Sequence, residues 1–353
     1  MNNINLEEFG YSDFYKRQVE EMNIDDKDIV PARVIEVHKE QYKVISRFGE
    51  KSAKLKGSLF YNDSFENEYP TVGDFVLVKY NPMGDDVIYE VLKRKSKFSR
   101  LDSWNLKEQI VAANFDYVFI VVSMNYDFNI KRIERYIACA WQSGGTPVII
   151  LTKCDLCSDY SEMIEKLNEI AFGIDIFAVS SYTGYGIDEL KKYIKRNKTL
   201  VLLGSSGVGK SSLTNTLAGK EIMKVNDIRE DDSKGRHTTT HRQMIFVSDG
   251  NMVIDTPGMR EMGLWDAENG MDETFSDIEE LAHNCKFSDC THNSEPGCAV
   301  RKALQEDTLS KERFKNYLKL QKEVKFAMEK EKRKLKSREF NNRKKKMKLK
   351  WRA

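Results

Sequence analysis

A glycine-rich run at residues 204–211 carries the clearest chemical information in the sequence. Gly204-Ser-Ser-Gly-Val-Gly-Lys210-Ser211 has the spacing G-x-x-x-x-G-K-[ST] and directly follows the apolar segment Leu200–Leu203. Between a strand and a helix, this spacing is typical of a phosphate-binding loop, whose backbone N–H groups face the phosphates. Lys210 would reach the β- and γ-phosphates, and the Ser211 hydroxyl would ligate Mg²⁺. The predicted nucleotide contacts here are Gly204, Ser205, Ser206, Gly207, Val208, Gly209, Lys210, Ser211 and Ser212.

A second element indicates which base is bound. Thr152–Asp155 follows the apolar segment Val148–Leu151 and matches the [NT]-K-x-D element of GTPases. A carboxylate at Asp155 accepts from two guanine nitrogens that adenine cannot supply, whereas a simple helix-capping Asp is the alternative. Ser180 and Ser181 end the next apolar segment and fit the loop whose backbone contacts the guanine oxygen. The predicted guanine contacts are Thr152, Lys153, Cys154, Asp155, Ser180 and Ser181.

The remaining nucleotide elements lie after the glycine-rich run. Asp255-Thr-Pro-Gly258 fits D-x-x-G, in which Asp255 holds Mg²⁺ through water and the Gly258 N–H contacts the γ-phosphate. The polar stretch Gly235–Thr240 suits a mobile switch loop, and Thr239 is the preferred candidate among its threonines to complete the magnesium shell. Ser211, Thr239 and Asp255 are therefore the predicted magnesium-shell residues.

The catalytic step has a less specific signature. Met259 follows Gly258 at the position where Ras-like enzymes place the glutamine that orients the attacking water. A thioether cannot orient water, so unaided hydrolysis is expected to be slow. His237 is the nearest polar candidate to orient the water. A role in stabilising the loop or contacting RNA is the alternative for His237. His237 and Lys210 are the two predicted catalytic residues.

The order of these elements is unusual. An ordinary GTPase has the phosphate loop first and N-K-x-D and the serine loop last, whereas here residues 152–155 and 180–181 precede residue 204. The sequence therefore predicts a circular permutation. The expected join is a helix over Ile187–Ile194 that passes through Lys195–Thr199 into the strand Leu200–Leu203.

Three cysteines and one histidine cluster near the C-terminal end. Cys285-x₄-Cys290-x-His292-x₅-Cys298 supplies three sulfur ligands and one imidazole. Four such ligands suit a tetrahedral structural zinc with no position left for a catalytic water. Buried unpaired cysteines are the alternative, and Cys139, Cys154 and Cys157 lie outside the cluster.

These residues need elements to position them. Residues 1–29 form an acidic extension, and residues 30–97 show short alternating segments with turn residues, which predict a five-stranded barrel of the OB type or, alternatively, of the SH3 type. Residues 105–270 alternate strands and helices as a parallel α/β sheet does. Residues 274–353 hold the cysteine cluster and a charged helix with the apolar stripe Phe314, Leu318, Val324 and Met328.

Composition and charge limit the class of protein. With 32% charged and 40% hydrophobic residues, and no apolar run near ~18 residues, a membrane or secreted protein is disfavoured and a reduced, cytoplasmic compartment is expected. The net charge of +2 conceals residues 330–353, where 13 Lys and Arg face two Glu. This tail favours a polyanion such as RNA, although a solvated tail, or an anionic lipid or acidic protein bound by a trafficking or regulatory GTPase, is the alternative. A metabolic P-loop kinase fits the guanine elements poorly.

The permuted order of motifs, with a barrel before and the cysteine cluster after, resembles the RsgA (YjeQ/EngC/YloQ) family of small ribosomal subunit biogenesis GTPases over about residues 30–300. The resemblance implies a GTP hydrolase that contacts the 30S subunit and its 16S rRNA through the OB and zinc domains, late in maturation. It also implies a monomer that uses one structural Zn²⁺ and Mg²⁺ with GTP. Thr152 stands where many GTPases have Asn, a change expected to weaken hydrogen bonding between loops.

Overall fold

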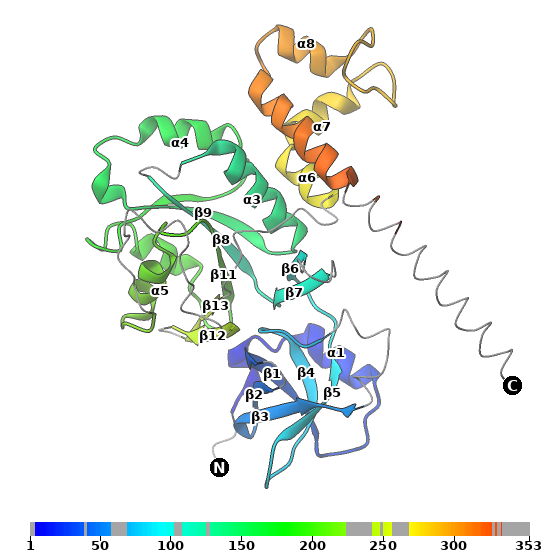
Figure 1. Cartoon of the computed structure of the whole chain (residues 1–353), viewed down its shortest axis with the longest axis vertical. Helices are drawn as coiled ribbons and strands as arrows, with labels where there is room; N and C mark the ends of the chain where they lie inside the picture. The colour runs from blue at the N-terminus through cyan, green and yellow to red at the C-terminus, as the bar shows by residue number, and fades with distance from the viewer. Residues whose placement is uncertain are drawn as a thin grey trace, which may run out of the picture. The chain divides into compact units, whose positions relative to one another are not determined.

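The computed structural model describes residues 4–38, 41–57, 69–101, 108–124, 128–223, 242–247, 250–255 and 268–326, together with residues 329 and 333. The chain forms two compact units, residues 1–263 and 264–353 (Figure 1). Each unit is described by itself below.

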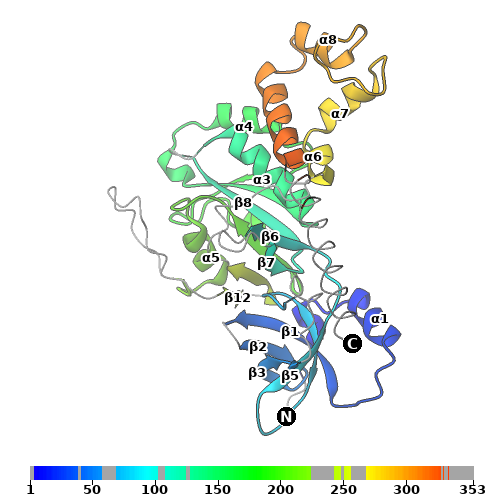
Figure 2. The ribbon, with the colours of Figure 1, turned by 45° about the vertical axis from the view of Figure 1, so that its right-hand side comes forward.

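The first unit begins with a closed five-stranded barrel. Its strands are β1 (Ile29–Val37), β2 (Tyr42–Ser46), β3 (Gly49–Leu55), β4 (Phe75–Lys79) and β5 (Asp86–Val91). They pair in the order β1-β2-β3-β5-β4, and β4 closes the barrel against β1 (Figure 2). The core includes Val34, Val44, Val76 and Ile88, all fully buried. The predicted OB-type barrel is confirmed, and β3 was missed because Ala53 is its only fully buried residue.

The acidic extension packs against this barrel. It contains a 3₁₀ helix, η1 (Leu6–Phe9), and the helix α1 (Asp13–Glu21). The Tyr15 ring lies 4.2 Å from that of Phe75, between ring centroids, and is 1% exposed. The Lys93 N–H donates to Gln18 Oε1 at 2.7 Å, so α1 is anchored at the end of the barrel segment.

The basic segment after the barrel forms a hairpin. β6 (Lys97–Leu101) pairs antiparallel with β7 (Glu108–Ala113), which the sequence did not predict. The Phe98 ring stacks on that of Phe115 at 4.8 Å. Basic residues at both ends of β6 obscured the short apolar alternation that a strand usually shows.

A six-stranded part of the sheet follows, in the order β10-β9-β8-β11-β13-β12. Its strands are β8 (Tyr117–Ser123), β9 (Thr146–Thr152), β10 (Ile176–Ala178), β11 (Thr199–Leu203), β12 (Arg242–Phe246) and β13 (Met252–Asp255). All pair in parallel except β12, which pairs antiparallel with β13. The strand β11 lies between β8 and β13 although it follows β8, β9 and β10 in the chain, as the predicted permutation requires.

Helices flank these strands. They are α3 (Ile130–Gln142), α4 (Ser161–Asn168) and α5 (Lys210–Ala218), with short 3₁₀ helices η2 (Cys154–Leu156) and η3 (Asp188–Lys192). From α5, Leu213 and Leu217 pack in one cluster with Phe119 and Val121 of β8. The predicted α/β fold is confirmed.

One predicted helix is wrong in type. The expected helix Ile187–Ile194 is only the five-residue 3₁₀ helix η3, between Gly186 with a φ of 70° and Asn197 with a φ of 63°. A Cβ on Gly186 would lie 2.2 Å from the Ala178 carbonyl oxygen, so glycine is required where the chain turns just before η3. The join itself is present and leads directly into β11.

The barrel strands and the strands β8–β13 share one continuous sheet. β12 pairs antiparallel with β1, with Glu36 opposite Gln243 and Val37 opposite Arg242. Beside this junction the fully buried Arg33 side chain donates to Asn114 O and Thr199 Oγ1, both at 2.9 Å. It also donates to the carbonyl oxygens of Phe9 and Gly73. Desolvation lowers the pKa of Arg33 to about 10, so the guanidinium stays charged at neutral pH.

The second unit consists of helices and the cysteine-containing loop. Its helices are α6 (Glu268–Thr274), α7 (Ser276–His283), α8 (Ala299–Gln305) and a helix over residues 311–326. The last helix buries Arg313, Tyr317, Leu320 and Val324. Val324 of the predicted stripe is thus buried, whereas Phe314 and Leu318 are only half-buried, so the register of the stripe is only partly as predicted. Met328 lies outside the described residues.

Polar contacts fix that register. Arg313 donates from Nε and Nη2 to the two Asp277 carboxylate oxygens at 2.8 and 2.6 Å, and Tyr317 Oη donates to Glu279 at 2.9 Å. Because the burial of Arg313 depends on its ion pair with Asp277, a search for apolar periodicity does not recognise it. Among the helices that the structure describes, none is long and apolar enough to span a membrane.

Candidate functional site

The glycine-rich run connects the end of β11 to the start of α5. Gly204 has a φ of 157°, and a Cβ there would lie 2.2 Å from the Val121 carbonyl oxygen, so only glycine fits against the neighbouring strand. Gly209 precedes α5 with a φ of 98°, in the left-handed region. Val208 is 1% exposed and fixes the loop to the core. The loop is therefore held at the amino end of α5, where backbone N–H groups and the helix dipole favour an anion.

Lys210 is the first residue of α5 and folds back over the loop. Its Nζ donates to the Gly204 carbonyl oxygen at 2.8 Å and to that of Ser205 at 2.5 Å. Ser211 and Ser212 follow in the first turn of α5 and are half-buried. The lysine charge is thus placed directly beside the loop that would surround the phosphates.

Residues 152–155 contact the same loop from the end of β9. Thr152 is 2% exposed, and its Oγ1 donates to the Val208 carbonyl oxygen at 2.5 Å and lies 3.3 Å from that of Val122. Lys153 has a left-handed φ of 59°, and its Nζ donates to the Gly207 carbonyl oxygen at 2.7 Å. A threonine hydroxyl therefore connects the two loops at the position where many GTPases have Asn.

The neighbouring loop after β10 lies beside residues 152–155. The Cys154 N–H donates to the Val179 carbonyl oxygen at 3.3 Å. Ser180 is fully buried, and its Oγ accepts from the N–H groups of Tyr182 and Thr183 at 3.2 and 3.1 Å. Ser181 is half-buried and Asp155 is exposed. The structure thus brings the loops after β9, β10 and β11 together at the carboxyl edge of the parallel strands, where open α/β sheets bind ligands.

Several predicted residues have no described side chain. Asp255 ends β13, where it pairs with Gln243, but only its backbone is described. His237, Thr239, Gly258 and Met259 lie outside the described residues, as does the rest of the stretch Gly235–Thr240.

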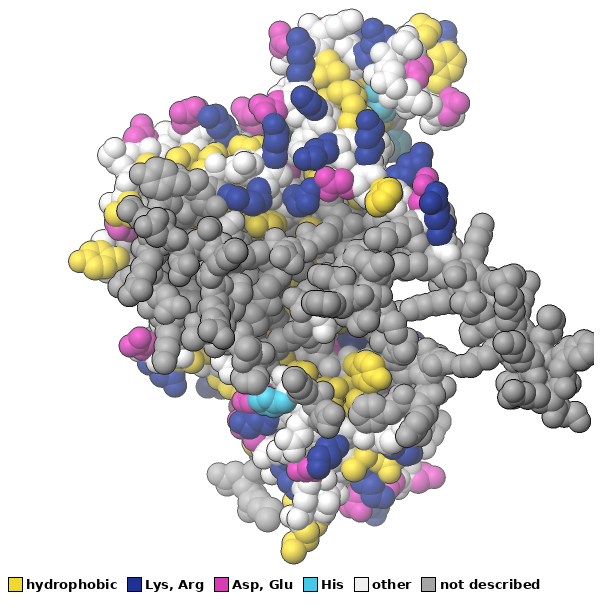
Figure 3. All heavy atoms as spheres, in the orientation of Figure 1, with side chains coloured by type: hydrophobic (Ala, Val, Ile, Leu, Met, Phe, Trp, Pro, Cys, Tyr) yellow, Lys and Arg dark blue, Asp and Glu magenta, His cyan; other side chains and the backbone are white. Residues whose placement is uncertain are grey.

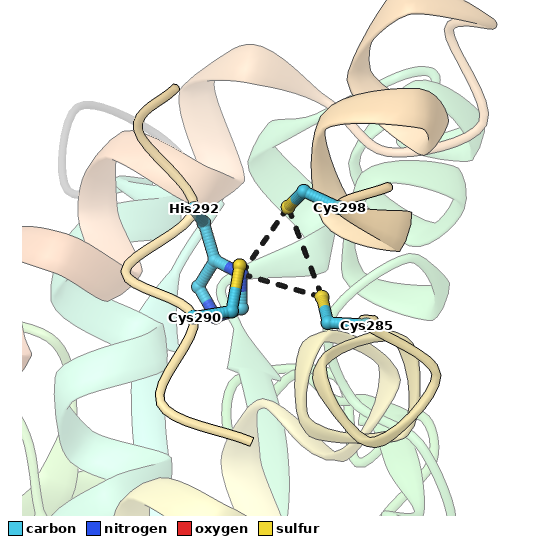
Figure 4. A group of neighbouring side chains, drawn as sticks. All are labelled: Cys285, Cys290, His292 and Cys298. Carbon is cyan, nitrogen blue, oxygen red and sulfur yellow. Dashed lines mark hydrogen bonds between the residues drawn. The ribbon is translucent and has the colours of Figure 1, made fainter. Parts of the chain in front are cut away.

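The second unit gathers the four predicted metal ligands. Cys285, Cys290, His292 and Cys298 place one ligand atom each within 4.8 Å of one another (Figure 4). The Cys285 and Cys298 sulfurs are 3.8 Å apart, and His292 Nδ1 lies 3.6 and 3.4 Å from them, respectively. A tetrahedral zinc with bonds of about 2.0–2.3 Å separates its ligands by roughly 3.5–3.8 Å, so the donor set fits a single ion.

Contacts around these ligands preset their geometry. Cys298 caps α8, and its sulfur accepts from the Arg301 N–H at 3.4 Å. Burial alone would raise the pKa of the Cys285 thiol, but backbone N–H groups of Val300 and Ala299 and the neighbouring thiols lower it overall. His292 has a left-handed φ of 59°, which turns the chain between two ligands.

Sequence reasoning missed Glu295, which organises this turn. Its carboxylate accepts from the N–H groups of Thr291, Asn293 and Ser294 at 3.0, 2.9 and 3.0 Å. It also accepts from the Thr291 hydroxyl, and this bond is the largest cause that lowers the pKa of Glu295 to about 2. The only indication of this role in the sequence was the position of Glu295 between His292 and Cys298. Acidic residues are common on protein surfaces, so this position alone did not predict the role.

The fold and the site define a circularly permuted P-loop GTPase. The solved structure titled "The crystal structure of YloQ, a circularly permuted GTPase" has the same fold, with a TM-score of 0.62 at 24% identity, covering 85% of this chain and 96% of that one. A family profile described as RsgA GTPase matches residues 91–265. The chain belongs to the RsgA GTPase family, whose members hydrolyse GTP.

Relatives support this assignment over nearly the whole chain. Small ribosomal subunit biogenesis GTPase RsgA 2 of Listeria monocytogenes serotype 4b is 48% identical over 319 residues, covering 90% of this chain and 89% of the relative. RsgA 1 of Oceanobacillus iheyensis is 40% identical over 336 residues, covering 94% and 95%. The crystal structure of YjeQ from Thermotoga maritima has a TM-score of 0.62 at 30% identity, covering 83% of this chain and 97% of that one.

Proposed function

We propose that this protein is a GTPase that binds the 30S ribosomal subunit and hydrolyses GTP to GDP and phosphate late in small-subunit maturation. The observation that carries the proposal is the 48% identity over 90% of the chain to a relative named for small ribosomal subunit biogenesis. We propose four parts of the chain. Residues 1–29 are an N-terminal extension, residues 30–97 an OB-fold domain, residues 105–270 the GTPase domain and residues 274–353 the zinc-binding domain.

GTP would bind where the three loops meet. Backbone N–H groups of residues 204–209 would hold the phosphates, Lys210 would contact the β- and γ-phosphates, and Asp155 would accept from the guanine base. Lys153, Cys154, Ser180 and Ser181 would line the base. Mg²⁺ accompanies GTP and supplies charge neutralisation, and Ser211, Thr239 and Asp255 are the residues proposed to hold it. The bonds from Thr152 and Lys153 to Val208 O and Gly207 O support one joint site, because they connect the base loop to the phosphate loop.

Hydrolysis would depend on the switch loop. His237 is proposed to orient the attacking water, since Met259 has no group that can do so. Docking on the subunit would order this loop and stimulate turnover.

The second unit would hold one structural Zn²⁺. The separations of 3.4–3.8 Å among His292 Nδ1 and the Cys285 and Cys298 sulfurs support a tetrahedral ion of this size. Three sulfurs and one imidazole complete the shell, so the ion would stabilise the fold and not take part in hydrolysis.

Two surfaces support contacts with 16S rRNA. On the barrel, the Phe48 and Tyr80 rings lie 4.0 Å apart, with the Arg47 guanidinium over Phe48 and the Lys51 ammonium over Tyr80, both at 4.7 Å. The two half-buried rings pack against each other and hold these cations at the barrel surface, where their charges suit phosphates. Lys56 lies over Tyr89 at 4.2 Å in the same way.

The helix over residues 311–326 presents the second surface. Its exposed lysines recur every three or four residues, which places them on the face opposite the buried one. They are Lys311, Lys315, Lys319, Lys322 and Lys325. Figure 3 shows Lys and Arg side chains gathered on this unit. In the sequence the basic residues 330–353 follow this helix closely, so positive charge that would attract a phosphate backbone continues along this part of the chain.

We propose that the protein is a monomer in the cytoplasm and that it does not bind membranes. Sedimentation of the tagged protein with purified 30S subunits, with a non-hydrolysable GTP analogue or with GDP, tests it directly. Binding is expected with the GTP analogue and not with GDP, and Asp155→Asn should lose this binding at the same nucleotide concentration. Binding to anionic vesicles instead of subunits would favour the trafficking alternative and overturn the proposal.

A further inference from the structure

Cys154 and Cys157 flank Asp155, the residue proposed to recognise guanine. Cys154-Asp155-Leu156-Cys157 is a C-x-x-C sequence at η2, in the loop after β9. Cys154 is buried and Cys157 is half-buried, and neither is a ligand of the cysteine cluster in the second unit. We propose that Cys154 and Cys157 form a reversible disulfide that lowers the affinity for guanine nucleotides. This inference rests on the proposed role of Asp155.

The backbone already brings the two cysteines within disulfide range. The Cys157 N–H donates to the Cys154 carbonyl oxygen at 3.2 Å, which closes a turn of four residues. Such turns hold their end Cα atoms less than about 7 Å apart, and disulfides span Cα separations of roughly 4.4–6.8 Å. Side-chain rotation without a large backbone movement can therefore join the sulfurs.

The reduced form has its own contacts, which oxidation would break. The Cys157 Sγ donates to the Asp159 carbonyl oxygen at 3.1 Å, whereas Cys154 is directed inward. Desolvation by burial raises the pKa of the Cys154 thiol, so Cys157 is the better first nucleophile. The pair is consequently stable as thiols until an oxidant reaches Cys157.

The oxidant is a low-molecular-weight disulfide, such as oxidised glutathione. The Cys157 thiol loses its proton and attacks one sulfur of the oxidant, which releases one thiolate that takes up the proton. The Cys154 sulfur then attacks Cys157 in the mixed disulfide, gives up its proton and releases the second small thiol. Two electrons pass from the cysteine pair to the oxidant, and a reducing dithiol reverses both steps.

The disulfide would constrain the base-reading loop. Asp155 and Leu156 would lie inside the closed ring. Cys154 also donates its N–H to Val179 O, and Lys153 donates to Gly207 O, so the small backbone adjustment that closes the ring acts on the contacts to both neighbouring loops. A tenfold loss of nucleotide affinity on oxidation requires that bound nucleotide disfavour oxidation tenfold, which raises the reduction potential of the pair by about 30 mV.

The test uses the full-length zinc-containing protein treated with oxidised glutathione or with dithiothreitol. Peptide mass spectrometry is expected to find a Cys154–Cys157 link, and GDP titration a loss of affinity of tenfold or more that dithiothreitol reverses. GDP present during oxidation should slow formation of the link. Cys157→Ser should keep its GDP affinity under oxidation, whereas Cys139→Ala, which removes a thiol elsewhere, should lose affinity as the wild type does.

Failure of this inference is distinct from failure of the proposed function. If the reduced protein prefers GDP to ADP but no link forms, or a link forms with unchanged affinity, the disulfide proposal is overturned and the guanine site stands. An equal loss of affinity in Cys157→Ser would also overturn it, since other thiols would then be responsible. If the reduced protein has no preference for GDP, the proposed function itself fails and the inference with it.

Discussion

The threonine that joins the base loop to the phosphate loop gives a sharp test of the nucleotide site. Thr152→Val keeps the shape of the side chain but removes the hydroxyl that bonds to the Val208 carbonyl oxygen at 2.5 Å. Both residues are at most 2% exposed, so water cannot replace the lost donor without movement of the loop. The substitution therefore isolates one hydrogen bond.

The expected magnitude follows from that burial. An acceptor left unpaired in the interior costs about 1–3 kcal/mol. If the phosphate loop keeps its conformation, this cost reduces the stability of the protein. If the loop relaxes instead, nucleotide binding must restore its conformation, and a cost of about 1–2 kcal/mol weakens GDP binding roughly 5- to 30-fold.

Both quantities can be measured on the same protein. Denaturant unfolding without nucleotide gives the change in stability, and GDP titration gives the change in affinity. Thr152→Ser retains the hydroxyl and is the matched control, which should lie much closer to wild type in both. Stability and affinity both unchanged in Thr152→Val would refute the inference that this bond connects the loops.

Further predictions concern the base, the water, the metal and the tail. Asp155→Asn should weaken GTP binding and favour xanthosine nucleotides, whose extra oxygen accepts from an amide; unchanged GTP affinity would contradict the assignment of Asp155. His237→Ala should lose most subunit-stimulated turnover with GTP binding near wild type, and Met259→Ala should change it less; full stimulated turnover in His237→Ala would remove this residue from the mechanism. Glu295→Gln should release zinc to a chelator several-fold faster, because an amide accepts more weakly than a carboxylate from Thr291 and its neighbours; equal release rates would show that this turn does not stabilise the metal site. Removal of residues 330–353 should reduce the slope of log affinity for the 30S subunit against log salt, since each phosphate neutralised contributes to it; an unchanged slope would leave the tail without a role in binding.

The sequence predicted those parts of the molecule whose geometry is local. The glycine-rich run determines its own turn, because only glycine fits at residue 204 against Val121 O, and Gly209 precedes α5 in a left-handed conformation. The spacing of the four metal ligands likewise predicted a cluster that the structure brings within 4.8 Å. In both cases the residue types that bind the ligand also determine the fold of the loop.

What the sequence did not predict depends on pairing between distant residues or on polar groups. β3 has a single fully buried residue, and its strand conformation comes from its neighbours β2 and β5. The register of the helix over residues 311–326 depends on the ion pair of Arg313 with Asp277. Apolar periodicity does not reveal such contacts, because they depend on backbone pairing or on polar side chains.

The junction of β1 with β12 is the most consequential of these long-range features. Arg33 of β1 contacts Thr199, the first residue of β11, and Met252, the first residue of β13. The opposite ends of the same two strands lead into the phosphate loop and into Asp255-Thr-Pro-Gly258. β12 joins the proposed switch stretch to β13 and pairs with β1 directly. The barrel therefore contacts the amino ends of the two strands whose carboxyl ends carry nucleotide motifs, so a displacement of β1 would act on the strands that position the phosphate loop.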